Sequence, residues 1–176
     1  QGGAGFDEFG LPLVILPGIE VPKLPRRQYH GKGELHALGS KAVETMNALG
    51  ICTFSSMAGE YPYLEAIHNA TGWEMTSHEF LEIGGRIQNL RQAFNVREGI
   101  TPKDFVLPDR VKGLPPLESG PNAHVTLDLD TMSAEFFRVM EWDAETGRPS
   151  RERLQTLGLA EVAELLYPEV GSPAVS

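Results

Sequence analysis

The chain has 176 residues, which is enough for one domain with a sizeable apolar core or for one part of a larger enzyme. Its net charge of -9 argues against a nucleic acid or an anionic membrane surface as partner, because both attract clustered lysine and arginine. A single cysteine excludes an intramolecular disulfide framework and favours a reducing, cytoplasmic location.

Residues 1–31 are interpreted as an extended, proline-rich arm that lies over another surface. The longest apolar run, residues 11–19, contains two prolines and is far shorter than the roughly 20 residues that cross a bilayer. The sequence therefore predicts no membrane span. Arg26, Arg27 and His30 form the only local basic cluster, which we interpret as a solvated loop.

Residues 32–170 are predicted to form one helical domain, followed by a tail over 171–176. The first helix begins at Lys32, because apolar residues then recur at steps of three and four. It ends at Gly50, since glycine tolerates the left-handed conformation that closes many helices. The apolar positions of this helix are Leu35, Leu38, Ala42, Met46 and Leu49.

A second strong helix signal begins at Thr76, which with Glu79 forms a capping box. The pair Gly84-Gly85 would let a neighbouring helix come close along this helix. Its apolar residues are expected to lie in the core: Phe80, Ile83, Ile87, Leu90 and Phe94.

Shorter helices follow. One is capped by Asp130 or Thr131, another by Ser150, and Gly158 ends the latter. Five or six short helices joined by Pro-rich loops make the predicted fold mainly α. Neither a P-loop nor a dinucleotide-binding glycine motif occurs in the sequence.

Cys52 follows the Gly50 turn and is the candidate functional residue. A thiolate there could attack a substrate, bind a metal or fill a core. The five histidines show no paired spacing, which argues against zinc, and the negative end of a helix dipole weakens a nucleophile. We favour metal coordination. Because iron–sulfur centres are held by several thiolates, the other ligands must then lie on polypeptide outside this chain.

The segment Asn47-Ala48-Leu49-Gly50-Ile51-Cys52 resembles the Asp-x-x-Gly-Leu-Cys motif of the tungsten-dependent aldehyde ferredoxin oxidoreductase family. Asn47 stands where the family has aspartate, and Ile51 where it has leucine. Further stretches in the same order resemble landmarks of the family's C-terminal region: residues 71–76, 86–90, 94–99, 107–110, 141–143 and 157–159.

This resemblance implies that Asn47, Gly50, Ile51 and Cys52 bind cofactor and that Cys52 is the last ligand of a 4Fe-4S cluster. It implies a tungsten (or molybdenum) bis-pterin, shared like the cluster with polypeptide outside this chain. The implied reaction interconverts small aldehydes and carboxylic acids, with ferredoxin or another carrier taking the electrons. The implied chain is a fragment or subunit whose catalytic acid/base residues lie elsewhere.

Three alternatives remain open at this stage. The chain could be part of a benzoyl-CoA reductase-like tungsten enzyme, a family that is similar to this one. It could instead be a non-catalytic helical docking subunit or remnant that binds no cofactor. Finally, Cys52 could be a buried small hydrophobic residue.

Overall fold

The computed structural model describes residues 16–52, 54 and 61–168, and its regular elements are helices. No β-strand occurs in the described ranges, where only two isolated bridges join Leu117 to Ala123 and Trp142 to Pro149. The predicted mainly α fold is therefore confirmed. The helices are α1 (Lys32–Ala48), α2 (Tyr63–Thr71), α3 (Ser77–Arg97), the 3-10 turn η2 (Pro102–Asp104), α4 (Asp109–Lys112), α5 (Leu129–Met140), α6 (Arg151–Thr156) and α7 (Ala160–Leu166).

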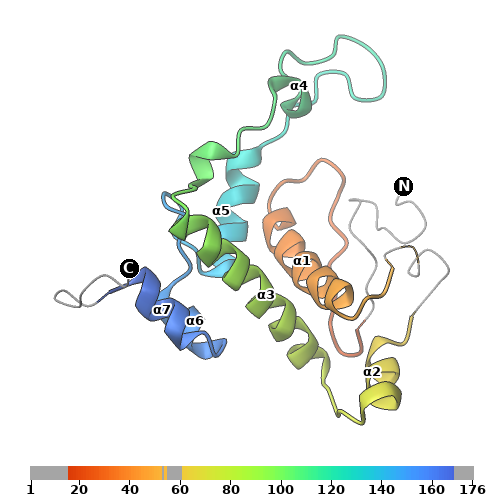
Figure 1. Cartoon of the computed structure of the whole chain (residues 1–176). Coiled ribbons are helices and arrows are strands. Elements are labelled where there is room, and N and C mark those ends of the chain that lie inside the picture. The colour runs from red at the N-terminus through yellow and green to blue at the C-terminus, as the bar shows by residue number, and fades with distance from the viewer. Residues whose placement is uncertain (1–15, 53, 55–60, 169–176) are drawn as a thin grey trace.

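The long helix α3 is the central element of the fold (Figure 1). It packs against α1 on one side and contacts α7 on the other, while α5 packs against α1. The segment around α4 projects away from the other helices (Figure 1). None of the helices in the described part of the chain is long and apolar enough to cross a membrane.

The contact between α1 and α3 is close because α3 carries a glycine where the backbones meet. A Cβ atom at Gly84 would lie only 1.8 Å from the carbonyl oxygen of Lys41 on α1. The hydroxyl of Thr45 donates to the carbonyl oxygen of Phe80 at 2.7 Å and so joins the same two helices. The sequence-based expectation of a close helix approach at Gly84-Gly85 is confirmed for Gly84.

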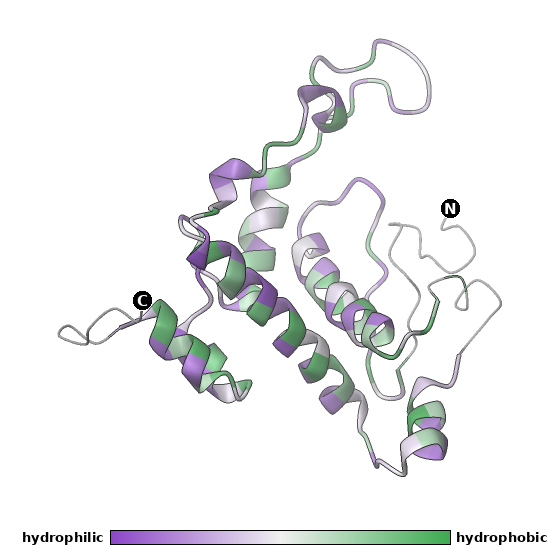
Figure 2. Cartoon of the chain, in the orientation of Figure 1, coloured by the Kyte–Doolittle hydropathy of each residue, from purple (hydrophilic) through white to green (hydrophobic). Residues whose placement is uncertain are grey.

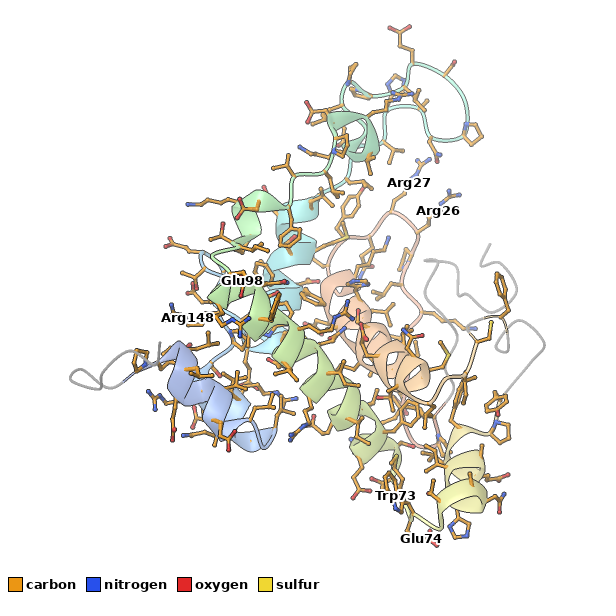
Figure 3. All side chains as sticks on the ribbon, viewed as in Figure 1. Arg26, Arg27, Trp73, Glu74, Glu98 and Arg148 are labelled. Atoms are coloured by element: carbon orange, nitrogen blue, oxygen red, sulfur yellow. The ribbon has the colours of Figure 1, made fainter. Side chains whose placement is uncertain are left out.

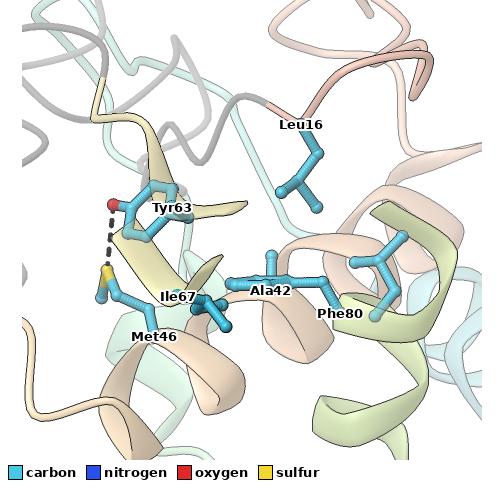
Figure 4. Close-up of a cluster of buried hydrophobic side chains, with 7 residues drawn as sticks. Leu16, Ala42, Met46, Tyr63, Ile67 and Phe80 are labelled. Carbon is cyan, nitrogen blue, oxygen red and sulfur yellow. Dashed lines mark hydrogen bonds between the residues drawn. The ribbon is translucent and has the colours of Figure 1, made fainter. Parts of the chain in front are cut away.

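The first core cluster lies between α1, α2 and α3 (Figure 4). Met46 and Phe80 are fully buried at its centre, and Tyr63 on α2 is 2% exposed. The Tyr63 hydroxyl donates to the Met46 sulfur at 3.4 Å, as the dashed line in Figure 4 shows. Leu16 also packs into this cluster, and Ser77 donates to the Pro17 carbonyl at 2.6 Å. Residues 16 and 17 are thereby attached to this core cluster and to α3.

The second core cluster joins α3 to the C-terminal helices. Ala93 of α3 packs with buried residues of α6, α7 and the turn between them, among them Leu154 and Ala163. Arg86 supports the same contact, since its guanidinium donates to the carbonyl oxygens of Leu157 at 2.5 Å and Gly158 at 3.1 Å. The predicted Ser150 cap is present, because its hydroxyl accepts from the Arg153 amide.

The prediction that the apolar residues of α3 lie in the core is right for the first half of the helix and wrong for the second half. Phe80 is buried and Ile83 and Ile87 are half-buried, but Leu90 is 47% and Phe94 is 54% exposed. Periodicity identifies the apolar side of a helix but not which part of it the same chain covers. The buried stripe instead continues through small and polar residues: Gly84, Gly85, Asn89 and Ala93.

The N-cap of α5 is Asp128, and the expectation of Asp130 or Thr131 is wrong. The Asp128 carboxylate accepts from the backbone amide of Thr131 at 3.0 Å and from its hydroxyl at 2.7 Å. These hydrogen bonds lower the pKa of Asp128. Three residues of capping type within four positions, Asp128, Asp130 and Thr131, made the choice ambiguous from the sequence.

Glu135 of α5 caps the first turn of α1, whose N-cap Gly31 has no side chain. Its carboxylate accepts from the amides of Gly31 at 2.8 and 2.9 Å and of Gly33 at 3.0 Å, and His30 lies 3.5 Å away. Burial alone would raise the pKa of Glu135, but these hydrogen bonds and His30 more than offset it and leave the pKa lowered.

We expect Glu135→Ala to cost about 1.5–3 kcal/mol of unfolding free energy, since it removes charge-assisted bonds and leaves amides without an acceptor. Because the pKa is lower in the folded chain, this stabilisation is present above about pH 4.5 and is lost as the pH falls through the folded value. Urea denaturation should therefore show that the difference in unfolding free energy between wild type and variant is smaller below pH 4.5 than at neutral pH. The exposed Glu118→Ala is the control, and an equal loss there would contradict this role.

Candidate cofactor-binding turn

The candidate site is the turn that ends α1. Leu49 is the C-cap and Gly50 has a φ of 72° in the left-handed region. The Gly50 amide donates to the Asn47 carbonyl at 3.0 Å, and the Ile51 amide donates to the Met46 carbonyl at 3.3 Å. These two bonds form a Schellman motif. The predicted glycine turn is therefore confirmed, and it brings Asn47, Gly50, Ile51 and Cys52 together within one turn.

The turn is anchored to the first core cluster. Ile51 is half-buried and packs against that cluster, which contains Met46 and Tyr63. The Thr45 hydroxyl fixes the last turn of α1 on α3 through the Phe80 carbonyl. Thr45 and Tyr63 thus position the turn although neither was singled out from the sequence. For Thr45, the sequence signal that could have indicated this role was its position on the apolar side of α1.

Cys52 is a free, exposed cysteine at the end of this anchored turn. The interpretation of Cys52 as a buried hydrophobic residue is therefore wrong for the chain by itself. Asn47 is exposed as well, and its side-chain amide makes no hydrogen bond to the described residues. The described part of the chain therefore leaves both side chains exposed.

Two exposed apolar residues lie close to Cys52 in the sequence. Leu49 is 40% exposed on one side of it in the sequence and Phe54 is 71% exposed on the other. Exposed apolar residues next to a candidate ligand are typical of a surface that another molecule covers. Residue 53 and residues 55–60, including the two serines of this loop, lie outside the described ranges.

The chain does not assemble a complete metal site from its described residues. These residues contain no group of three or more His, Cys, Asp or Glu side chains that could hold a metal ion. One exposed sulfur on a fixed turn fits the role of a single ligand to a cluster that needs several thiolates. It does not fit a metal site whose ligands all come from the described residues of this chain.

We expect Gly50→Ala to destabilise the chain by about 1–2 kcal/mol, because a Cβ atom makes the left-handed conformation costly. No atom lies within 4 Å of that Cβ, so the cost is conformational rather than steric. Gly50→Asn should lose less, since asparagine tolerates this region better. Urea denaturation of the three proteins measures the effect. Equal stability of Gly50→Ala and wild type would contradict the assigned turn.

A family model described as "Aldehyde ferredoxin oxidoreductase, domains 2 & 3" matches residues 6–159. Proteins named tungsten-containing aldehyde ferredoxin oxidoreductase are similar to the chain: that of Pyrococcus abyssi is 33% identical over 163 residues, 92% of this chain and 26% of its own length. The Thermococcus kodakarensis protein is 34% identical over 118 residues, 66% of this chain and 19% of its own length.

The chain thus spans about a fifth to a quarter of the length of these curated relatives. The matched range, residues 6–159, contains every landmark identified in the sequence, from the glycine turn to residues 157–159.

Proposed function

This chain belongs to the aldehyde ferredoxin oxidoreductase family, and from that premise we propose that it is the C-terminal part of a tungstopterin oxidoreductase. The proposed enzyme interconverts small aldehydes and carboxylic acids and passes electrons to ferredoxin or a similar carrier. The observation that carries the proposal is the exposed Cys52 sulfur on a fixed turn, in a chain whose described residues form no group of three or more potential metal ligands.

Cys52 is the proposed ligand to one iron of a 4Fe-4S cluster. The Schellman motif and the anchoring of Ile51 hold the backbone on either side of Gly50. A fixed backbone keeps the sulfur in place when the oxidation state of the cluster changes, which favours electron transfer. The remaining thiolates belong to polypeptide outside this chain.

Asn47, Gly50 and Ile51 are proposed to contact the pterin. Gly50 has no Cβ, so a flat ring system can approach the backbone closely at this point. Asn47 offers a carboxamide, which both donates and accepts, where the family's motif has an acceptor-only carboxylate. The bound tungsten bis-pterin supplies the redox chemistry, while these residues orient it and exclude water.

The rest of the enzyme is proposed to cover the exposed apolar surface. Besides Leu49 and Phe54, the second half of α3 exposes Leu90 and Phe94. The stretch between η2 and α4 is hydrophobic, as its green colour in Figure 2 shows, and Phe105 is 65% and Val106 75% exposed. Apolar surface of this extent favours a large, permanent interface. A cytoplasmic location is part of the same proposal, because a free thiol ligand requires a reducing compartment.

Metal analysis tests this function. The chain should be purified alone and together with any larger polypeptide that accompanies it, and iron and tungsten should be measured in both. We expect both metals in the assembled protein and neither in stoichiometric amount in the chain alone. An assembled protein free of iron and tungsten would contradict the proposal and would leave a docking subunit without cofactor.

A further inference from the structure

A second site lies at the other end of α1. A pocket of about 370 Å³ is lined by five of the chain's 15 lysine and arginine residues, which come from the arm, α1 and α4. The net charge of the chain is -9, so such a concentration of cations does not follow from its composition. The five residues are Arg26, Arg27, Lys32, Arg110 and Lys112.

The pocket walls are held by contacts between distant segments. Figure 3 shows Arg26 and Arg27 on the turn before α1, with Arg27 reaching toward the loop that follows α4. The Arg27 guanidinium donates to the carbonyl oxygen of Pro121 at 3.0 Å. The Tyr29 hydroxyl donates to the carbonyl oxygen of Thr126, which closes the same wall. The cations are therefore brought together by the fold and do not lie on a loose loop.

The α4 side of the pocket is equally fixed. The amide of Leu127 donates to the carbonyl oxygen of Lys112 at 2.9 Å. A Cβ atom at Gly113 would lie 2.4 Å from the carbonyl oxygen of Val125, so α4 lies directly against the segment that leads to α5.

Three of the five cations, Arg26, Arg27 and Arg110, have no acidic partner among the residues that the structure describes. No aspartate or glutamate is among its lining residues. Lys112 pairs with Asp109 at 3.0 Å, but Arg27 and Arg110 donate only to neutral carbonyl oxygens. The Arg26 guanidinium forms no hydrogen bond or ion pair with the residues that the structure describes. Several guanidinium donors are thus open to an anion.

The rest of the lining is apolar or aromatic. Tyr29, Val111, Leu127 and Met132 line the pocket between the cations. Its volume is that of a small-molecule site rather than of a protein interface. Arginine pairs bind phosphate oxygens in a fork-like geometry that lysine cannot match. We propose that this pocket binds a small phosphate ester with an apolar or aromatic body.

The pocket and the Gly50 turn lie at opposite ends of α1, about 25 Å apart at 1.5 Å per residue. Lys32 is the first residue of that helix and lines the pocket, whereas Cys52 follows its end. Phosphate binding at the first site can therefore succeed or fail independently of metal binding at the second.

Calorimetric titration of the full 176-residue chain with phenyl phosphate tests the proposal, with inorganic phosphate and phenol as the charge-only and ring-only probes. We expect saturable one-to-one binding of phenyl phosphate that is tighter than that of either probe. Arg26→Ala combined with Arg110→Ala should weaken it by about tenfold or more, since two charge-assisted contacts are lost. Circular dichroism verifies that the variant keeps its helices.

Arg91→Ala is the matched control, because Arg91 lies on α3 outside the pocket and pairs with Glu44 of α1. It should leave binding unchanged. An equal loss in the control would mean diffuse electrostatic attraction and would overturn the proposal, as would the absence of saturable binding. If the chain binds phenyl phosphate but the assembled protein does not, an acidic protein segment fills the pocket and the small-molecule assignment is wrong.

Discussion

Gly84→Ala is expected to lower the unfolding free energy by about 3 kcal/mol or more, and the midpoint of thermal unfolding by about 6–12 °C. The added methyl would lie 1.8 Å from the Lys41 carbonyl oxygen, and also close to the carbonyl carbon and Cα of that residue. Backbone atoms cannot move aside as a flexible side chain can. Helices α1 and α3 must separate, which opens the first core cluster and shifts the turn that carries Cys52.

Gly85→Ala is the matched control at the next position of the same helix. The nearest atom to its Cβ is the Arg153 Nη2 at 3.3 Å, at the far end of a flexible side chain. Alanine favours a helix interior over glycine by about 1 kcal/mol, so Gly85→Ala should be neutral or slightly stabilising. Denaturant unfolding of the two variants measures the difference. Similar stabilities would contradict the close approach of α1 and α3.

Cys52→Ala is expected to remove iron from the assembled protein while leaving the fold of the chain unchanged. The thiol is exposed, so its loss removes little buried apolar surface and opens no cavity. A cluster that lacks one of its thiolates is held less firmly, and electron transfer depends on that cluster. Iron content and the electron paramagnetic resonance signal of the reduced protein should therefore fall together.

His68→Ala provides the control for this variant, because His68 is a partly exposed potential metal ligand on α2 that pairs with Glu74. Iron content should be the same as in wild type. If Cys52→Ala also keeps its full iron content and signal, Cys52 is not a ligand.

Features that depend on a few neighbouring residues were predictable from the sequence. The left-handed end of α1 follows from Gly50 among helix-forming residues, and the Thr76–Glu79 capping box is present as expected. The mainly α fold follows from the same periodic signals. Local backbone chemistry determines these features, and no distant segment overrides it.

Features that depend on distant segments were not predictable. Leu90 and Phe94 have core-like spacing, but the described part of the chain leaves them exposed. Arg26 and Arg27 were interpreted as a solvated loop and are exposed, but the sequence did not show that the fold brings them together with cations from residues 32 to 112. The capping of α1 by Glu135 could not be predicted from the sequence for the same reason, because Glu135 lies on a different helix. The sequence also indicates Cys52 as a candidate metal ligand, but it does not identify the groups that would complete the coordination of that metal.

The role of Cys52 is tested best by locating iron in a structure of the assembled protein by anomalous scattering. Iron should lie within bonding distance of the Cys52 sulfur, with the other ligands of that cluster on polypeptide outside this chain. A structure in which this sulfur touches only carbon atoms, with every iron elsewhere, would contradict it.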